Sequence, residues 1–70
     1  MEYTSKKNGY IGIVKKGNFA GIGKHWDYTV FNDKGKFVYH ATLSGPMSKE
    51  ALQEDVDNFP EFIKMLTEDF

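Results

Sequence analysis

The amino-acid sequence predicts a small α+β domain in which a C-terminal helix packs on one face of a three-stranded antiparallel β-meander. Residues 10–43 hold three runs rich in β-branched and aromatic side chains, separated by glycine-containing turns. Residues 48–70 repeat apolar side chains at steps of three and four, the spacing of one helical face. With 70 residues the chain has room for one domain. We therefore expect a flexible N-terminal lead-in over residues 1–9 and a single β-β-β-α domain over residues 10–70.

The first predicted strand covers residues 10–16 and is rich in β-branched side chains. Gly17 and Asn18 follow it, and glycine at the first central position suits a two-residue type II′ hairpin turn. That turn would place Lys16 opposite Phe19 and Ile13 opposite Ile22.

The second and third predicted strands are joined by a turn at residues 32–35. The second strand is interrupted by glycines at its start and then alternates cleanly over residues 25–31, and residues 37–43 form the third strand. A four-residue loop with Gly35 at positive φ pairs Tyr28 with Tyr39 and puts most apolar side chains on one face. This predicted core face consists of Ile11, Ile13, Ile22, Trp26, Tyr28, Val30, Phe37, Tyr39, Ala41 and Leu43. We expect Trp26 to be largely buried beneath the helix.

The predicted helix begins after Ser48, a favourable N-cap residue, and has Glu50 in its first turn. Its apolar stripe is formed by Leu52, Val56, Phe59, Ile63, Leu66 and Phe70. Pro60 interrupts the hydrogen-bond ladder without interrupting the stripe. The helix is therefore either kinked at Pro60 or split there, with a second helix that holds the proline in its first turn.

The composition argues against an enzyme. The sequence has no cysteine, which excludes disulfides, thiolate metal sites and thiol nucleophiles. It has no Ser/His/Asp catalytic set, and we expect no cofactor. No apolar run follows the N-terminal charges, and none approaches the roughly 20 residues of a membrane span. We expect a cytoplasmic protein with no membrane association, of a type common in bacteria and their mobile elements.

Two groups of polar residues are candidates for a phosphate-binding or metal-binding site. Residues 17–24 resemble a phosphate-binding loop, but Asn18 stands where the first glycine belongs and His25 where Ser or Thr is needed. His25, Asp27 and His40 are expected to gather on the outward sheet face, with Asp27 directly opposite His40. Such side chains bind metals or transfer protons, but a third ligand and a pocket are missing, so we expect an exposed cross-strand polar pair and no metal site.

Two loose resemblances point to nucleic acids. Residues 14–23 are similar to the KOW motif of ribosomal and transcription-factor barrels, mainly through their glycines. The three-strand-and-helix layout resembles AP2-type and integrase N-terminal DNA-binding domains, with matching residues at 26–29, 34–36 and 48–51. Those domains read the major groove from the exposed sheet face, usually with several arginines, whereas this sequence has none.

The charge distribution leaves two functional classes. Residues 1–46 carry seven lysines against three acids, net +4, and residues 47–70 carry two lysines against seven acids, net −5. We favour a non-catalytic protein-interaction or regulatory module that binds an unknown partner through an acidic helix face or an exposed sheet edge. The predicted partner-binding residues are Glu50, Glu54, Asp57 and Glu61. The alternative is a nucleic-acid-binding domain that uses Lys15, Lys16, Lys34, Lys36 and His40. A monomer or weak homodimer fits either class.

Overall fold

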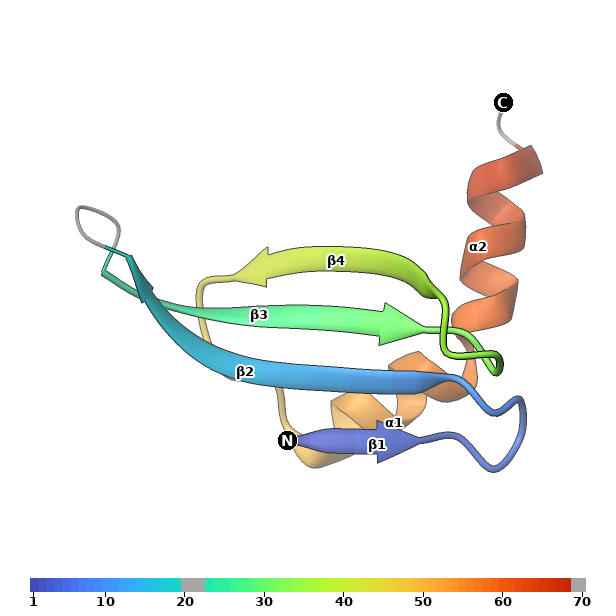
Figure 1. The fold of residues 1–70 in the computed structure, drawn as a ribbon, viewed down its shortest axis with the longest axis horizontal. Helices are drawn as coiled ribbons and strands as arrows, with labels where there is room; N and C mark the ends of the chain where they lie inside the picture. The colour runs from blue at the N-terminus through green and yellow to red at the C-terminus, as the bar shows by residue number, and fades with distance from the viewer. Residues whose placement is uncertain (20–22, 69–70) are drawn as a thin grey trace.

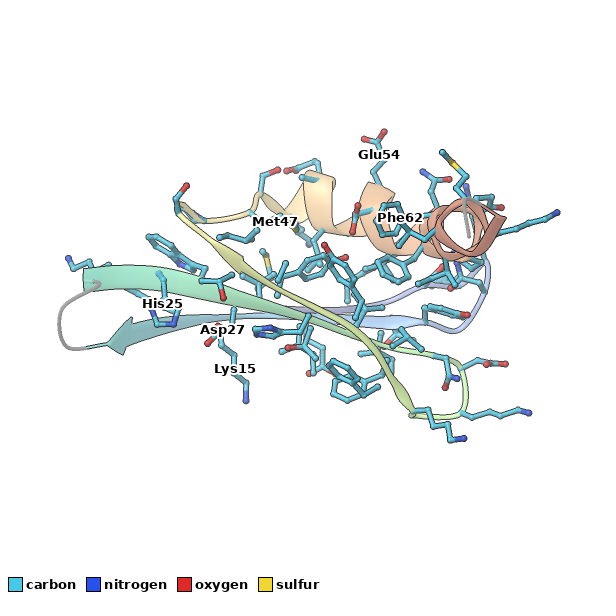
Figure 2. The ribbon with its side chains drawn as sticks, turned by 90° about the horizontal axis from the view of Figure 1, so that it is seen from above. Lys15, His25, Asp27, Met47, Glu54 and Phe62 are labelled. Carbon is cyan, nitrogen blue, oxygen red and sulfur yellow. The ribbon has the colours of Figure 1, made fainter. Side chains whose placement is uncertain are left out.

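The computed structural model describes residues 1–19 and 23–68, with the side chains of residues 18, 19, 67 and 68 outside this description. The elements, in chain order, are β1 (Glu2–Thr4), β2 (Ile11–Phe19), β3 (Gly23–Phe31), β4 (Phe37–Leu43), α1 (Lys49–Asp57) and α2 (Phe59–Glu68). The strands form one antiparallel sheet in the order β1-β2-β3-β4 (Figure 1). Both helices lie on the same side of this sheet (Figure 2). We call the side that they cover the inner face and the opposite side the outer face.

The α+β class with an antiparallel sheet is confirmed, but the sheet has four strands rather than three. The additional strand, β1, lies within residues 1–9, where the sequence suggested only a lead-in. The chain returns from β1 to β2 through a tight turn. In this turn the Ser5 hydroxyl accepts the backbone N–H groups of Lys7 and Asn8, and Gly9 has a φ of 79°. These side-chain-to-backbone bonds make a polar, glycine-containing segment a turn rather than a loose tail.

The predicted hairpin turn at Gly17 and Asn18 is wrong, because both residues belong to β2. Gly17 pairs with His25 and Lys16 with Trp26. A Cβ atom at position 17 would lie 2.5 Å from His25 Nε2, so the missing side chain makes room for the imidazole. The glycine therefore serves a close side-chain approach within the strand.

This register moves two isoleucines to the outer face. Ile11 pairs with Phe31 and Ile13 with Thr29, whereas the intervening Gly12 and Val14 face the helices. The prediction that Ile11 and Ile13 join the core face is wrong, because the misplaced turn changed the parity of the pairing. The predicted core residue Ile22 lies outside the described residues.

The pairing of β3 with β4 is displaced by two residues from the prediction. Tyr28 pairs with Ala41 rather than with Tyr39, and a bulge follows, so that Phe31 pairs with Phe37. A displacement of two preserves the faces, and Tyr28 remains in the core. Phe37 is the exception, because the bulge brings it beside Phe31, where it is 61% exposed. Gly35 has the positive φ that the turn prediction required, 77°.

The core lies between the inner face and the helices. Its buried residues are Val14, Tyr28, Val30, Leu52, Val56 and Phe59. Trp26 is only half-buried at the margin of this cluster, with the Lys16 ammonium 6.0 Å from its ring centroid. The prediction that Trp26 is largely buried is therefore wrong, because α1 packs farther along the strands.

The C-terminal segment is two helices, the second of the two predicted alternatives. Ser48 caps α1 as predicted, since its hydroxyl accepts the Ala51 N–H at 3.1 Å. Asn58 separates the helices, and Pro60 is the second residue of α2, where its missing N–H costs little. The stripe is buried only as far as Phe59. Ile63 is half-buried, Leu66 is exposed and Phe70 lies outside the described residues.

Two tyrosines and an asparagine form hydrogen bonds that hold α1 against the sheet. The Tyr28 hydroxyl donates to Asp55, and the Tyr3 hydroxyl donates to Asp57 at 2.8 Å. The Asn8 amide donates to the carbonyls of Val56 and Asp57, which lie at the C-terminal end of the helix. The orientation of α1 is thus fixed from both β1 and β3.

Candidate functional site

The predicted acidic face is only partly available to a partner. Glu50, Glu54 and Glu61 are exposed, and Figure 2 shows Glu54 projecting away from the sheet. Asp57 is half-buried and accepts hydrogen bonds from Ser5 Oγ at 2.6 Å and from the Tyr3 hydroxyl. The Ser5 bond, followed by the Tyr3 bond, lowers the pKa of Asp57 below its ordinary value. The geometry therefore gives Asp57 a structural task and leaves three exposed acids on the helices.

The predicted basic set is divided between two faces of the sheet. Lys15 and His40 lie on the outer face, and Lys34 and Lys36 are exposed in the turn between β3 and β4. Lys16 lies on the inner face beside Trp26. One ligand on the outer face could contact four of these five residues, but not Lys16.

His25, Asp27 and His40 gather on the outer face, as predicted. Asp27 lies between the imidazoles, with Oδ2 3.5 Å from His25 Nε2 and Oδ1 3.4 Å from His40 Nε2. The residue directly opposite Asp27 is Thr42, so the predicted pairing with His40 is wrong and the contact runs diagonally. His25 is not exposed but 4% accessible. Within the described residues, no group of three His, Cys, Asp or Glu side chains is arranged to hold a metal ion.

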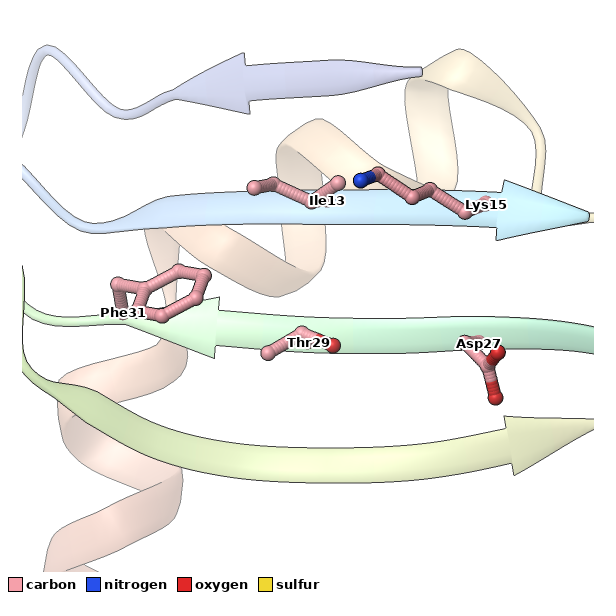
Figure 3. A pocket seen from close by; sticks show the side chains of 5 residues that line it. All are labelled: Ile13, Lys15, Asp27, Thr29 and Phe31. Carbon is pink, nitrogen blue, oxygen red and sulfur yellow. The ribbon is translucent and has the colours of Figure 1, made fainter.

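A shallow hollow of about 130 Å³ lies on the outer face beside Asp27 (Figure 3). It is lined by Ile13, Lys15, Asp27, Thr29 and Phe31. Pockets that enclose small molecules usually measure roughly 300–1,000 Å³. The hollow is thus a depression between β2 and β3 rather than an enclosed ligand site.

The free edge of β4 is a further candidate site. The sequence predicted an exposed sheet edge but did not indicate which strand forms it. β4 is the terminal strand of the sheet, and no described strand pairs with its second side. Its seven residues, Phe37–Leu43, include no Lys, Asp, Glu or Pro. Proteins commonly place such residues on edge strands to block pairing with another chain. The backbone of β4 is consequently open to a further strand.

The apolar stripe of α2 continues beyond this edge. Phe59 is 1% exposed, but Phe62, Met65 and Leu66 are 39%, 64% and 41% exposed. The Phe62 ring packs against Tyr39 of β4, with centroids 5.8 Å apart. Figure 1 shows α2 crossing the end of the sheet and running past β4. We call these three exposed residues, Phe62, Met65 and Leu66, the α2 overhang.

The sequence contained the apolar residues of the overhang but not their exposure. Periodicity placed Leu66 on the stripe that buries Leu52 and Val56. The new direction that the chain takes at Asn58 and Pro60 carries the stripe away from the sheet. The direction of a second helix is set by tertiary packing, which periodicity does not report.

Comparisons of the chain with protein-family models, curated proteins and solved structures find no match. Among the helices that the structure describes, none has the length and apolar character needed to cross a membrane. The exposed edge of β4, the α2 overhang and the charged surfaces of the molecule therefore carry the information about function.

Proposed function

We propose that this chain is a non-catalytic protein-interaction module whose docking surface is the free edge of β4 together with the α2 overhang. The observation that carries this proposal is the exposure of three large apolar side chains on one helix, directly beside an unpaired strand. Clustered apolar exposure of this kind marks interaction surfaces.

The two parts of this surface suit the addition of a β-strand. A strand placed beside β4 forms main-chain hydrogen bonds with the free N–H and C=O groups, which supply affinity for any extended segment. Its inward-pointing side chains lie next to Tyr39 and under the overhang, which selects apolar residues at alternate positions. We expect the partner to contribute an extended segment with an alternating apolar pattern.

Glu61 precedes Phe62 of the overhang in α2, whereas the other exposed acids lie on α1, which packs over β1 and β2. Glu50, Glu54 and Glu61 remain our predicted partner-binding residues, with the role of attracting a basic partner. Rim charges of this kind act mainly on association rate and on salt dependence. Asp57 is excluded from this role because its carboxylate is held by Tyr3 and Ser5.

The test measures how much partner protein binds to the immobilised chain. It compares wild type with the double variant Met65→Ser/Leu66→Ser. Both side chains are exposed, so the variant is expected to keep its melting temperature and to lose the bound protein. Lys64→Ser is the matched control, because it alters the same helix outside the overhang. Equal capture by the double variant and wild type would overturn the proposal.

One observation favours nucleic-acid binding as a second candidate function. Phe31 and Phe37 pack edge to face on the outer face, 6.4 Å apart, beside the turn that carries Lys34 and Lys36. Aromatic rings next to lysines are the elements of a platform for single-stranded nucleic acid. Against it stand the net charge of −1 and the absence of arginine. Salt-sensitive binding of a single-stranded oligonucleotide that Phe37→Ser abolishes would favour this candidate instead.

A further inference from the structure

We propose that the strand which docks on β4 is the β4 strand of a second copy of this chain, giving a symmetric dimer with one continuous eight-stranded sheet. This inference rests on the proposed function, since it names the occupant of the same surface. Three features carry it: the free edge of β4, the exposed apolar residues of the α2 overhang, and the half-buried Trp26 and Leu43 on the inner face.

The residue pattern of β4 permits antiparallel pairing with itself. A twofold axis perpendicular to the sheet places the inner faces of both copies on the same side. With the axis at Ala41, Tyr39 lies opposite Leu43 of the second copy, and His40 lies opposite Thr42. The small Ala41 side chain stands at the axis, and no two like charges oppose each other. The seam therefore continues apolar contacts on the inner face and polar contacts on the outer face.

The overhang of each copy reaches an incompletely covered surface of the other. Phe62 packs on Tyr39, and Leu66 follows one helical turn later on the same stripe. In the paired sheet, Leu43 of the second copy lies next to Tyr39. Trp26 of the second copy lies beyond that Leu43, because Trp26 of β3 pairs with Leu43 of β4. Trp26 and Leu43 are only half-buried in the single chain. Twofold symmetry forms this contact twice.

The surfaces brought together also carry opposite charge. Lys16 and Lys24 occupy inner-face positions at the Trp26 end of the sheet, as their pairing with Trp26 and with Asn18 requires. The sequence of α2 contains two acids, Glu61 and Glu68, against the single lysine Lys64. The second helix of one copy, with one more acid than lysine, thus faces the basic end of the other, which favours this arrangement.

The experiment is a charge swap across the seam, read by sedimentation velocity over a range of protein concentrations. His40→Glu/Thr42→Glu and His40→Lys/Thr42→Lys each place like charges opposite each other in a β4 pair. Both positions are exposed on the outer face, but Asp27 lies opposite Thr42 and beside His40, so the glutamate variant is expected to melt below the lysine variant, and both are compared at a temperature where they are folded. Wild type is expected to dimerise, each double variant to be monomeric, and an equimolar mixture of the two variants to form a heterodimer.

Two further variants separate the edge from other surfaces. Thr4→Glu places the same charge on the outer face of β1, at the opposite edge, and is expected to leave the dimer intact. Met65→Ser/Leu66→Ser is expected to raise the dimer dissociation constant at least about tenfold, since it removes the apolar part of the contact.

Three results would overturn the dimer: a wild type that is monomeric at every concentration, charge variants that still dimerise, or a mixture that forms no heterodimer. The proposed function fails separately. If wild type is monomeric but captures a different protein through the overhang, the interaction surface stands and the second copy as its occupant is rejected.

Discussion

Gly12 sets the distance between α1 and the sheet. A Cβ atom at this position would lie 2.5 Å from Val56 Cγ2 and 2.9 Å from Leu52 Cδ1, distances at which the side chains must move. Both are fully buried core residues with little room to shift. The glycine thus lets the helix pack against the backbone of β2.

Gly12→Ala is therefore expected to lower the free energy of unfolding by about 1–3 kcal/mol, the usual effect of overpacking a core. Chemical denaturation monitored by Trp26 fluorescence measures it. Gly45→Ala is the control, since a Cβ there meets nothing within 4 Å. If Gly12→Ala matches the control, the close packing of α1 on β2 is contradicted.

Asp57 makes stability sensitive to acid. Because its pKa is lowered, chiefly by the Ser5 hydroxyl, the carboxylate stabilises the fold above its unfolded pKa of about 4. That contribution is lost as pH falls through the lower folded value. Asp57→Asn is expected to be less stable at neutral pH and to lose less stability between about pH 5 and 2. An acid profile parallel to that of wild type would show that Asp57 contributes nothing.

The tyrosines that bind α1 produce the opposite dependence at high pH. The hydrogen bond to Asp57 raises the pKa of Tyr3, and burial raises that of Tyr28. Their protonated hydroxyls stabilise the fold fully below the ordinary tyrosine pKa of about 10, and this is lost as pH rises through the raised values. The double variant Tyr3→Phe/Tyr28→Phe is expected to show a flatter alkaline unfolding curve. Tyr10→Phe, which leaves both pairs in place, serves as the control.

At the scale of the element, α2 packs on the core at Phe59 and Ile63 and is exposed at Met65 and Leu66. Phe59→Ala is expected to destabilise by about 3–5 kcal/mol, because it empties a buried site between Tyr10 and Tyr39. Met65→Ala, six residues farther along α2, is expected to change stability by less than about 0.5 kcal/mol. Thermal melts at low protein concentration, where self-association contributes least, compare the two. Similar losses for both would mean that α2 packs along its whole length.

Local signals predicted the helices better than the sheet. The Ser48 cap, which depends on residues within a few positions, is found as expected, and Pro60 stands in the first turn of a second helix, one of the two predicted alternatives. The hairpin depended on whether Gly17 makes a turn or makes room for His25, and that imidazole comes from the facing strand. The sequence around Gly17 does not distinguish these uses.

The sequence also predicted the candidate interaction surfaces only in part. The exposure of Glu50, Glu54 and Glu61 follows from their positions opposite the apolar stripe. Asp57 has the same spacing, but its carboxylate is bound by Tyr3, which is 54 positions away in the sequence. The sequence predicted an exposed sheet edge without choosing a strand, and the strand order shows that β4 forms one of the two edges.

At the scale of the whole molecule, residues 1–9 complete both the sheet and the attachment of α1. Deleting them removes the bonds from Tyr3 and Ser5 to Asp57 and from Asn8 to the end of α1. We expect a loss of at least about 3 kcal/mol, counting about 1 kcal/mol for each net hydrogen bond. Amide hydrogen exchange compares the deletion variant with the full chain. Unchanged protection of α1 would show that these residues are the dispensable lead-in that the sequence suggested.

The attachment of β1 to α1 also has a consequence for the order in which a newly made chain acquires its structure. Strands β2, β3 and β4 join sequence neighbours, whereas the bonds from Asn8 to Val56 close a separation of 48 residues. On a ribosome that adds roughly 5–20 residues per second, Asn8 waits roughly 2–10 s for its acceptors to be synthesised. The bonds that attach Tyr3, Ser5 and Asn8 to α1 are thus among the last to form, although β1 can already pair with β2 in that interval. Until the helices are made, the inner face of the sheet lacks its cover, and a nascent chain is most open to chaperones there.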